Sequence, residues 1–339
     1  MRARAAICIV AVGLSSFFGL PSSLYAQSLP VFRADTDVVV VPVTVTDRSG
    51  HFVSGLAAAD FEVSDGGARR ELTQFSTERV PVSLGILLDI SGSMATDPKA
   101  RALDDARWAD TRRALELLVQ RLSPRDEVLF AAFADKVGLA VPWTRDHQRV
   151  PRAFDALRPG GYTALFDAVR LIAPAFQRAE HQRKVLLVVS DGRDSLVPHV
   201  GVPPVYRSPP TREQQVQLEI LRRQRALRDT AVGAAQRVVT KSGAALYAIG
   251  MGTGKGAHVD LENLESLTAD SGGYVEAINE PSEITAAVGR IFDELQSQHM
   301  LAFEPAHTDG KYHDISVTTR NRELRVRARA GYTAPESGK

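Results

Sequence analysis

The chain has 339 residues, of which 44% are apolar and 24% are charged, a composition typical of a soluble globular protein with a sizeable core. Its 41 basic and 40 acidic side chains nearly cancel, which argues against a surface built to bind nucleic acid or an anionic membrane. Cys8 is the only cysteine, so a chain that has lost its first residues can form no disulfide, zinc-thiolate site or cysteine nucleophile.

The first 26 residues have the pattern of an export signal. They combine a basic start, an apolar run and small residues before a cleavage point: Arg2 and Arg4, residues 5–20, and residues 22–26. We predict that residues 1–26 are a signal peptide, with an uncleaved N-terminal anchor as the alternative. The apolar run is short for a membrane span, which needs about 20 residues. We therefore expect a secreted or periplasmic protein with no transmembrane segment in the mature chain, able to associate with the cell envelope.

Residues 27–80 have an all-β pattern. The β-branched run 37–46 predicts one strand. Residues 61–64 and 71–75 flank Asp65-Gly66-Gly67, which is a hairpin signal. We expect a small N-terminal β segment.

Residues 81–298 alternate apolar strands with helical patterns. We predict strands over residues 84–89, 127–133, 140–143, 185–190, 246–250 and 274–278. The predicted helices begin with one capped by Asp97-Pro98 and continue over residues 163–177, 213–240, 260–270 and 282–298. This alternation predicts an α/β fold with a doubly wound, mostly parallel six-stranded sheet covered on both faces. Such sheets bind ligands beyond the carboxyl ends of their strands.

Two details of this region carry expectations of their own. In the long helix over residues 213–240, Val216, Ile220, Leu227 and Val232 are expected to be buried. The proline-rich stretch 197–210 cannot form a regular element, and it is either a ligand-selecting loop or a tolerated insertion.

Residues 299–334 return to strands, predicted over 300–303, 312–319 and 323–329. In the last of these, apolar residues alternate with Arg325, Arg327 and Arg329, whose arginine face we expect to point to water. Neither β segment is large enough to form a core alone. We predict that residues 27–80 and 299–334 pair into one small β domain, with the α/β domain inserted between them.

Oxygen-bearing side chains recur where predicted strands end. Asp89, Ser91 and Ser93 follow the strand 84–89, and Asp191 follows the strand 185–190. Thr163 lies in a glycine-led loop that opens a helix. Carboxylates and hydroxyls that converge in this way suit a hard divalent cation such as Mg²⁺.

This arrangement, D-x-S-x-S followed by T and then D, resembles the metal-ion-dependent adhesion site of the von Willebrand factor type A domain family. Bacterial proteins related to that family also resemble the whole layout, including the phrases over residues 41–47, 60–62 and 329–332. The resemblance implies that Ser91, Ser93 and Thr163 bind Mg²⁺ or Mn²⁺ directly, while Asp89 and Asp191 act partly through water. It also implies a protein partner that supplies a Glu or Asp to the cation.

On this basis we expect a metal-dependent recognition or adhesion module that is not an enzyme. One alternative is a Mg²⁺-dependent phosphoester hydrolase, in which Arg193 and Lys99 would clamp phosphate and Asp194 would act as base. The other is a structural envelope protein with a vestigial site. A zinc site is not expected, because the eight histidines show no H-x-x-x-H spacing.

Overall fold

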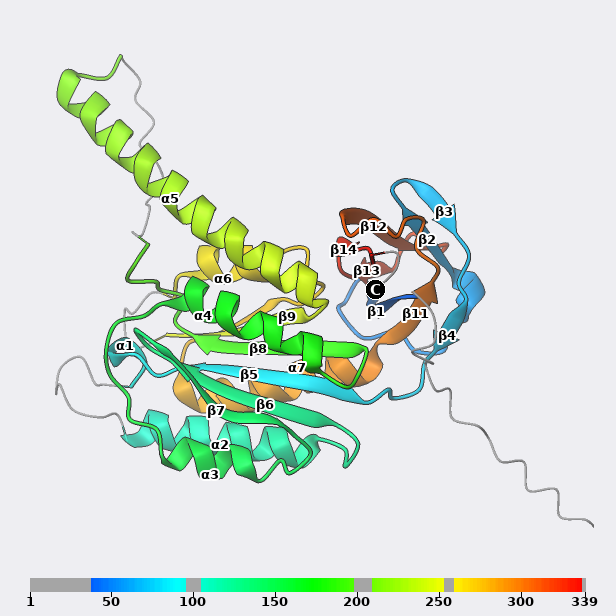
Figure 1. Cartoon of the computed structure of the whole chain (residues 1–339), viewed down its shortest axis with the longest axis horizontal. Coiled ribbons are helices and arrows are strands. Elements are labelled where there is room, and N and C mark those ends of the chain that lie inside the picture. The colour runs from blue at the N-terminus through cyan, green and yellow to red at the C-terminus, as the bar shows by residue number, and fades with distance from the viewer. Residues whose placement is uncertain (1–37, 96–104, 198–208, 253–258, 337–339) are drawn as a thin grey trace, which may run out of the picture. The chain divides into compact units, whose positions relative to one another are not determined.

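The computed structural model describes residues 38–95, 105–197, 209–252 and 259–336 (Figure 1). All of these belong to one compact unit. The predicted signal peptide, the Asp97-Pro98 helix start, Lys99 and most of the proline-rich stretch lie outside the described residues. Among the described helices, none combines the length and apolar character that a membrane span requires.

The centre of the molecule is a six-stranded sheet with the strand order β10-β9-β8-β5-β6-β7. Its strands are β5 (Val82–Asp89), β6 (Glu127–Phe133), β7 (Val137–Thr144), β8 (Arg183–Ser190), β9 (Ala245–Met251) and β10 (Val275–Ile278). All neighbours pair in parallel except β7, which is antiparallel to β6. The predicted six-stranded, mostly parallel sheet is therefore confirmed.

Helices cover both faces of this sheet because its strands are apolar on both sides. One face packs against α2 (Asp105–Arg121), α3 (Arg149–Asp155) and α7 (Ile284–Ser297). The other packs against α4 (Leu165–Ile172), the 3₁₀ helix η2 (Ala173–Arg178), α5 (Arg212–Ser242) and α6 (Leu261–Thr268) (Figure 1). The strand β5 contributes to both cores, with Ile86 facing the first and Leu87 the second. The short helix α3 was not predicted.

The register of β5 places the predicted site. This strand pairs with β8 so that Leu88 lies opposite Val189, and with β6 so that Asp89 lies opposite Phe133. Asp89 and Ser190 are thus the last residues of two neighbouring parallel strands. Because parallel strands end at the same edge of a sheet, both lie where ligands of doubly wound sheets bind.

Two smaller four-stranded sheets combine strands from both ends of the chain, with the orders β13-β1-β11-β4 and β14-β12-β2-β3. From the N-terminal side come β1 (Val39–Thr46), β2 (Phe61–Asp65), β3 (Ala68–Arg70) and β4 (Gln74–Ser76). From the C-terminal side come β11 (His299–Phe303), β12 (Tyr312–Thr319), β13 (Arg325–Arg327) and β14 (Gly331–Thr333). A shared core that includes Val41, Phe61, Leu301 and Phe303 lies between them. The exact domain limits stay a prediction.

The predicted N-terminal hairpin is correct in its turn but wrong in its second strand. Gly66 and Gly67 both have positive φ angles, and the chain returns at once through β3, with Asp65 paired to Ala68. A two-residue turn of this kind needs positive φ at both positions, which suits glycine. Residues 71–75 do not form the return strand. Instead β4 joins the other sheet and pairs with β11.

Two burial predictions are also wrong. Val216, Ile220 and Leu227 are exposed, because the first half of α5 extends beyond the sheet and only its second half reaches the core, at Val232 (Figure 1). The arginine face of the last strand does not point uniformly to water either. Arg325 is exposed, but Arg327 donates to the buried carboxylate of Glu294.

Candidate functional site

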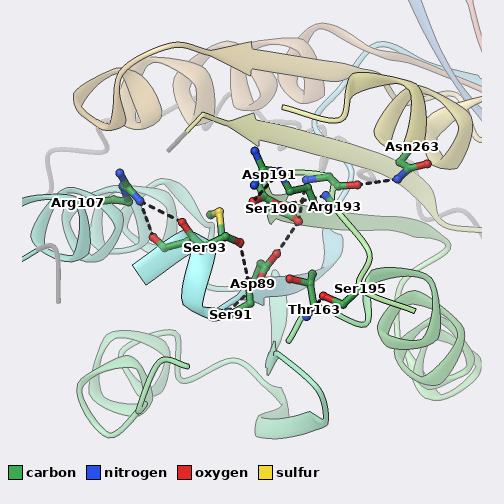
Figure 2. Close-up of polar contacts among 12 residues, drawn as sticks. Asp89, Ser91, Ser93, Arg107, Thr163, Ser190, Asp191, Arg193, Ser195 and Asn263 are labelled. Carbon is green, nitrogen blue, oxygen red and sulfur yellow. Dashed lines mark hydrogen bonds and ion pairs between the residues drawn. The ribbon is translucent and has the colours of Figure 1, made fainter. Parts of the chain in front are cut away.

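The carboxylate of Asp89 is buried and held at both oxygens. The backbone N–H of Ser91 donates to Asp89 Oδ1 at 2.9 Å, and the hydroxyl of Ser190 donates to Asp89 Oδ2 at 2.7 Å. The first bond is local to the turn after β5, whereas the second comes from the end of β8. Asp89 is therefore fixed by both strands that flank the site (Figure 2).

Ser91 and Ser93 face each other across the same turn, with 3.2 Å between their Oγ atoms. Ser93 lies in the short helix α1 (Gly92–Ala95). The buried side chain of Arg107, in α2, donates to the carbonyls of Ser93 and Met94 at 3.4 and 3.1 Å. Arg107 thereby anchors the serine turn, a role that was not predicted from the sequence. The sequence feature that could have indicated this role is a charged residue within a helix that packs on the core.

The loop that carries Thr163 is tied to this turn through backbone hydrogen bonds. Gly92 N–H donates to the carbonyl of Gly161 at 3.1 Å, and Gly160 N–H donates to the carbonyl of Ile90 at 2.8 Å. Gly160 and Gly161 both have positive φ angles, which side-chain-bearing residues rarely adopt. The Thr163 side chain is buried beside Asp89 and Ser91 (Figure 2).

Asp191 continues directly from β8 and is buried. Its Oδ1 accepts a hydrogen bond from Arg193 N–H at 3.0 Å, whereas its Oδ2 is buried and has no hydrogen-bond partner. The next residue, Gly192, has φ +77°, and a Cβ there would come within 2.3 Å of the Asp260 carbonyl oxygen. Asn263, in α6, holds this tight turn by donating to the Gly192 carbonyl at 2.9 Å.

The electrostatics of the two carboxylates follow from this burial. Burial raises the pKa of Asp89 from 3.8 to about 7, and the nearby charge of Asp191 adds to the rise. The hydrogen bonds from Ser91 and Ser190 act in the opposite direction. Two neighbouring buried carboxylates are unfavourable without compensating positive charge, of which Arg193, with its Nε 3.8 Å from Asp191 Oδ2, supplies one unit.

The donor set therefore fits a hard divalent cation. It consists of carboxylate and hydroxyl oxygens, which are the ligands that Mg²⁺ and Mn²⁺ prefer. All five residues predicted from the sequence lie together at the carboxyl edge of the sheet (Figure 2): Asp89, Ser91, Ser93, Thr163 and Asp191. Among the described residues, no group of three or more His, Cys, Asp and Glu side chains forms a metal site of another type.

Asp194, considered above as the base of a hydrolase, accepts hydrogen bonds from backbone N–H groups through both of its oxygens. Its Oδ2 accepts from Phe166 N–H at 3.0 Å, in the first turn of α4, and its Oδ1 accepts from Leu196 N–H at 2.8 Å. Burial raises its pKa. The side chain thus satisfies backbone donors at the start of the helix that follows Thr163. Arg193 lies nearer the site, with its Nε 3.8 Å from Asp191 Oδ2.

Comparison with known proteins supports the assignment of the α/β part. Residues 84–193, about a third of the chain, match the model of the von Willebrand factor type A domain. The matched segment begins within β5 and ends just beyond Asp191, so it contains all five predicted site residues. This part of the chain is therefore similar to von Willebrand factor type A domains. No curated protein matches the chain.

Solved structures show distant similarity. An aerotolerance-related membrane protein from Bacteroides fragilis has 19% identity and a TM-score of 0.44, covering 63% of this chain and 98% of that one. The vWF domain of the type V pili tip protein Mfa5 from Porphyromonas gingivalis has 13% identity and a TM-score of 0.46, covering 63% and 94%. Proximal thread matrix protein 1 from the mussel byssus, with a zinc-occupied MIDAS motif, has 17% identity and a TM-score of 0.42, covering 64% and 48%.

Proposed function

We propose that this protein is an exported recognition module that uses a divalent cation to bind an acidic residue of a partner protein. The observation that carries the proposal is the pair of buried carboxylates Asp89 and Asp191, whose Asp191 Oδ2 accepts no hydrogen bond and has only the guanidinium of Arg193, 3.8 Å away, as a neighbouring positive charge. A buried carboxylate oxygen without a donor is costly, and a bound cation would remove that cost.

The five proposed ligands fall into two groups, which differ in charge. Asp89 and Asp191 supply two negative charges that balance a divalent cation, while Ser91, Ser93 and Thr163 supply neutral oxygens. When bound, Mg²⁺ or Mn²⁺ would act as a Lewis acid with affinity for one further anionic oxygen. In this proposal a Glu or Asp of the partner supplies that oxygen. Hydrogen bonds hold Asp89 through Ser91 N–H and Ser190 Oγ, and Asp191 through Arg193 N–H, independently of any cation.

The surface beside these residues favours a protein partner. Tyr162 and Leu196 are 76% and 68% exposed, and each is adjacent in sequence to one member of the hydrogen-bonded pair Thr163 and Ser195. Large exposed apolar side chains next to a polar centre are typical of protein contact surfaces. Asp194, the candidate base of a hydrolase, is engaged with backbone donors instead. We therefore favour recognition without turnover.

The test is capture of a partner from envelope extract or culture fluid by the immobilised protein. We expect capture with Mg²⁺ or Mn²⁺, and loss of it with chelator. Asp89→Ala should lose both Mg²⁺ binding in calorimetry and capture, while keeping its circular dichroism spectrum. Tyr162→Ala should bind Mg²⁺ normally but capture less partner.

Unchanged Mg²⁺ affinity in Asp89→Ala would defeat the metal assignment. Capture that survives both the chelator and Asp89→Ala would defeat metal-dependent recognition. Turnover of phosphoesters by the wild-type protein, lost in Asp89→Ala, would favour a hydrolase instead.

A further inference from the structure

A cavity of about 440 Å³ lies away from the predicted metal site. It is bounded by the start of β1, the start of β8, the end of α5 and the β14 region. Three of its lining side chains are cationic and come from distant parts of the sequence: Lys184, Lys241 and Arg329. Three positively charged side chains thus line one partly open cavity.

Among the described residues, none of these three cations takes part in an ion pair. The Nε of Arg329 is buried and has no hydrogen-bond partner. Burial lowers the pKa of Arg329 to about 10, and burial together with the charge of Arg329 lowers the pKa of Lys184. Lys184 and Arg329 are half-buried, and a buried guanidinium nitrogen without a hydrogen-bond partner is costly unless an anion lies beside it.

Two carboxylates that interact with residues lining the cavity also have hydrogen-bond partners of their own. Glu127, the carboxylate that opposes the pKa shift of Lys184, accepts hydrogen bonds from Ser83 Oγ and Glu180 N–H, both at 2.6 Å. Asp65 accepts from the hydroxyl of the lining residue Tyr332 at 3.0 Å. Glu127 therefore offsets part of the positive charge from a distance, but neither carboxylate forms an ion pair with Lys184, Lys241 or Arg329 in the described part of the chain.

The end of α5 compensates part of the positive charge. This helix ends at the lining residue Gly243 in the left-handed conformation, and a Cβ there would lie 3.7 Å from Arg329 Nη1. The carbonyl end of a helix has a partial negative charge of about half a unit, which is less than the charge of three cations. The helix end therefore offsets only part of the charge of the three cations that line the cavity.

We propose that this cavity binds a small dianion of the phosphate type, held by Lys184, Lys241 and Arg329. Arginine and lysine are the usual ligands of phosphate oxygens, and arginine can bind two oxygens at once. The volume lies within the range of about 300–1,000 Å³ found for small-molecule sites, so it can also hold a compact organic group attached to the phosphate.

The experiment is calorimetric titration of the full mature chain, stripped of metal and then freed of chelator, so that the predicted metal site cannot take up the anion. The probes are inorganic phosphate, glycerol 1-phosphate and acetate. We expect saturable binding of the two phosphates and none of acetate. Tighter binding of glycerol 1-phosphate would identify a phosphate ester as the ligand, and tighter binding of inorganic phosphate would identify the free ion.

Variants test the residues. Lys184→Gln and Arg329→Gln should each weaken phosphate binding about tenfold or more, as expected for one charge-assisted hydrogen bond. Lys241 is exposed at the cavity edge, so Lys241→Gln tests the site without disturbing the fold. The matched control is Arg222→Gln, an exposed cation nearer the other end of α5. Absence of saturable phosphate binding, or equal weakening in the control and in Lys241→Gln, would overturn the proposal.

Discussion

Thr163 and Ser195 hold each other through two hydrogen bonds. Ser195 N–H donates to the Thr163 carbonyl at 2.7 Å, and Thr163 N–H donates to Ser195 Oγ at 3.0 Å (Figure 2). The pair fastens the loop after β8 to the loop that begins α4. Because the Thr163 hydroxyl has to face the carboxylates to bind a cation, this brace sets its position without touching the metal.

Ser195→Ala should therefore weaken Mg²⁺ binding without removing a ligand. It deletes the acceptor of Thr163 N–H and keeps the other hydrogen bond of the pair. We expect an affinity loss of about tenfold, as is usual for groups that orient metal ligands. Calorimetry with Mg²⁺ measures it, and Ser195→Thr, which keeps the hydroxyl, should restore most of the affinity. An unchanged affinity in Ser195→Ala would contradict the positioning role.

Asp191→Asn should change metal-free and metal-loaded protein in opposite directions. The substitution removes one of two facing buried charges, so the metal-free variant should unfold at a higher temperature than the metal-free wild type. It also removes a ligand charge, so Mg²⁺ should no longer raise its melting temperature. Thermal unfolding with and without Mg²⁺ measures both effects. A metal-free variant that is less stable than wild type would contradict the prediction, because it would show that the contacts of Asp191 with Arg193 outweigh its repulsion from Asp89.

The raised pKa of Asp89 predicts an unusual pH dependence for the metal-free protein. Its pKa is 3.8 ordinarily and about 7 in the folded chain, so between these values the folded state keeps a proton that the unfolded state has lost. The contribution of this group to the free energy of unfolding is therefore fully present below pH 3.8 and falls as pH rises toward 7, by at most about 1.4 kcal/mol per pH unit.

Urea unfolding of metal-free protein at several pH values tests this, with Asp89→Asn as the control. The difference in stability between wild type and variant should change with pH in the window from about 4 to 7 and level off above it. Saturating Mg²⁺ should abolish the loss of wild-type stability at neutral pH, because it binds the ionised carboxylate. A difference in stability that stays constant across this window would contradict the raised pKa of Asp89 in the metal-free protein.

Much of this arrangement was predictable because its signals are local. The apolar strand β5 ends at Asp89, and Asp191 directly follows β8. Parallel strands share an edge, so the two carboxylates had to lie close together. The doubly wound sheet followed from the same alternation. The turn at Asp65-Gly66-Gly67 was likewise predicted correctly. It depends only on the positive φ angles of two adjacent glycines, which the local sequence reveals.

What could not be predicted depends on partners distant in sequence. The helical spacing of apolar residues predicts that Val216 and Ile220 are buried. They are exposed because the sheet does not extend beneath the first half of α5. Arg107 lies in a helix that packs on the core, and only the fold shows that it reaches the serine turn. The alternation of its strand predicts that Arg327 faces water. In the fold Arg327 donates a hydrogen bond to Glu294, which lies on the distant helix α7.

Glu294 itself leads to a prediction about stability. This buried carboxylate of α7 receives hydrogen bonds from Thr44 Oγ1 and Tyr247 OH, both at 2.9 Å, and from Arg327. Its donors thus come from β1 and β13 of a small sheet and from β9 of the central sheet. Glu294 ties these elements together through one charged centre.

Glu294→Leu should lower the free energy of unfolding by about 3 kcal/mol or more, because it leaves Arg327 partly buried without its carboxylate. Chemical denaturation at pH 7 measures the loss. The control is Asp293→Asn, one residue earlier in α7, where an exposed carboxylate pairs with the exposed Arg121 at 3.1 Å. Exposed pairs contribute about 0–1 kcal/mol, so the control should unfold nearly as the wild type does. Equal losses in the two variants would show that the buried centre contributes no more than a surface ion pair.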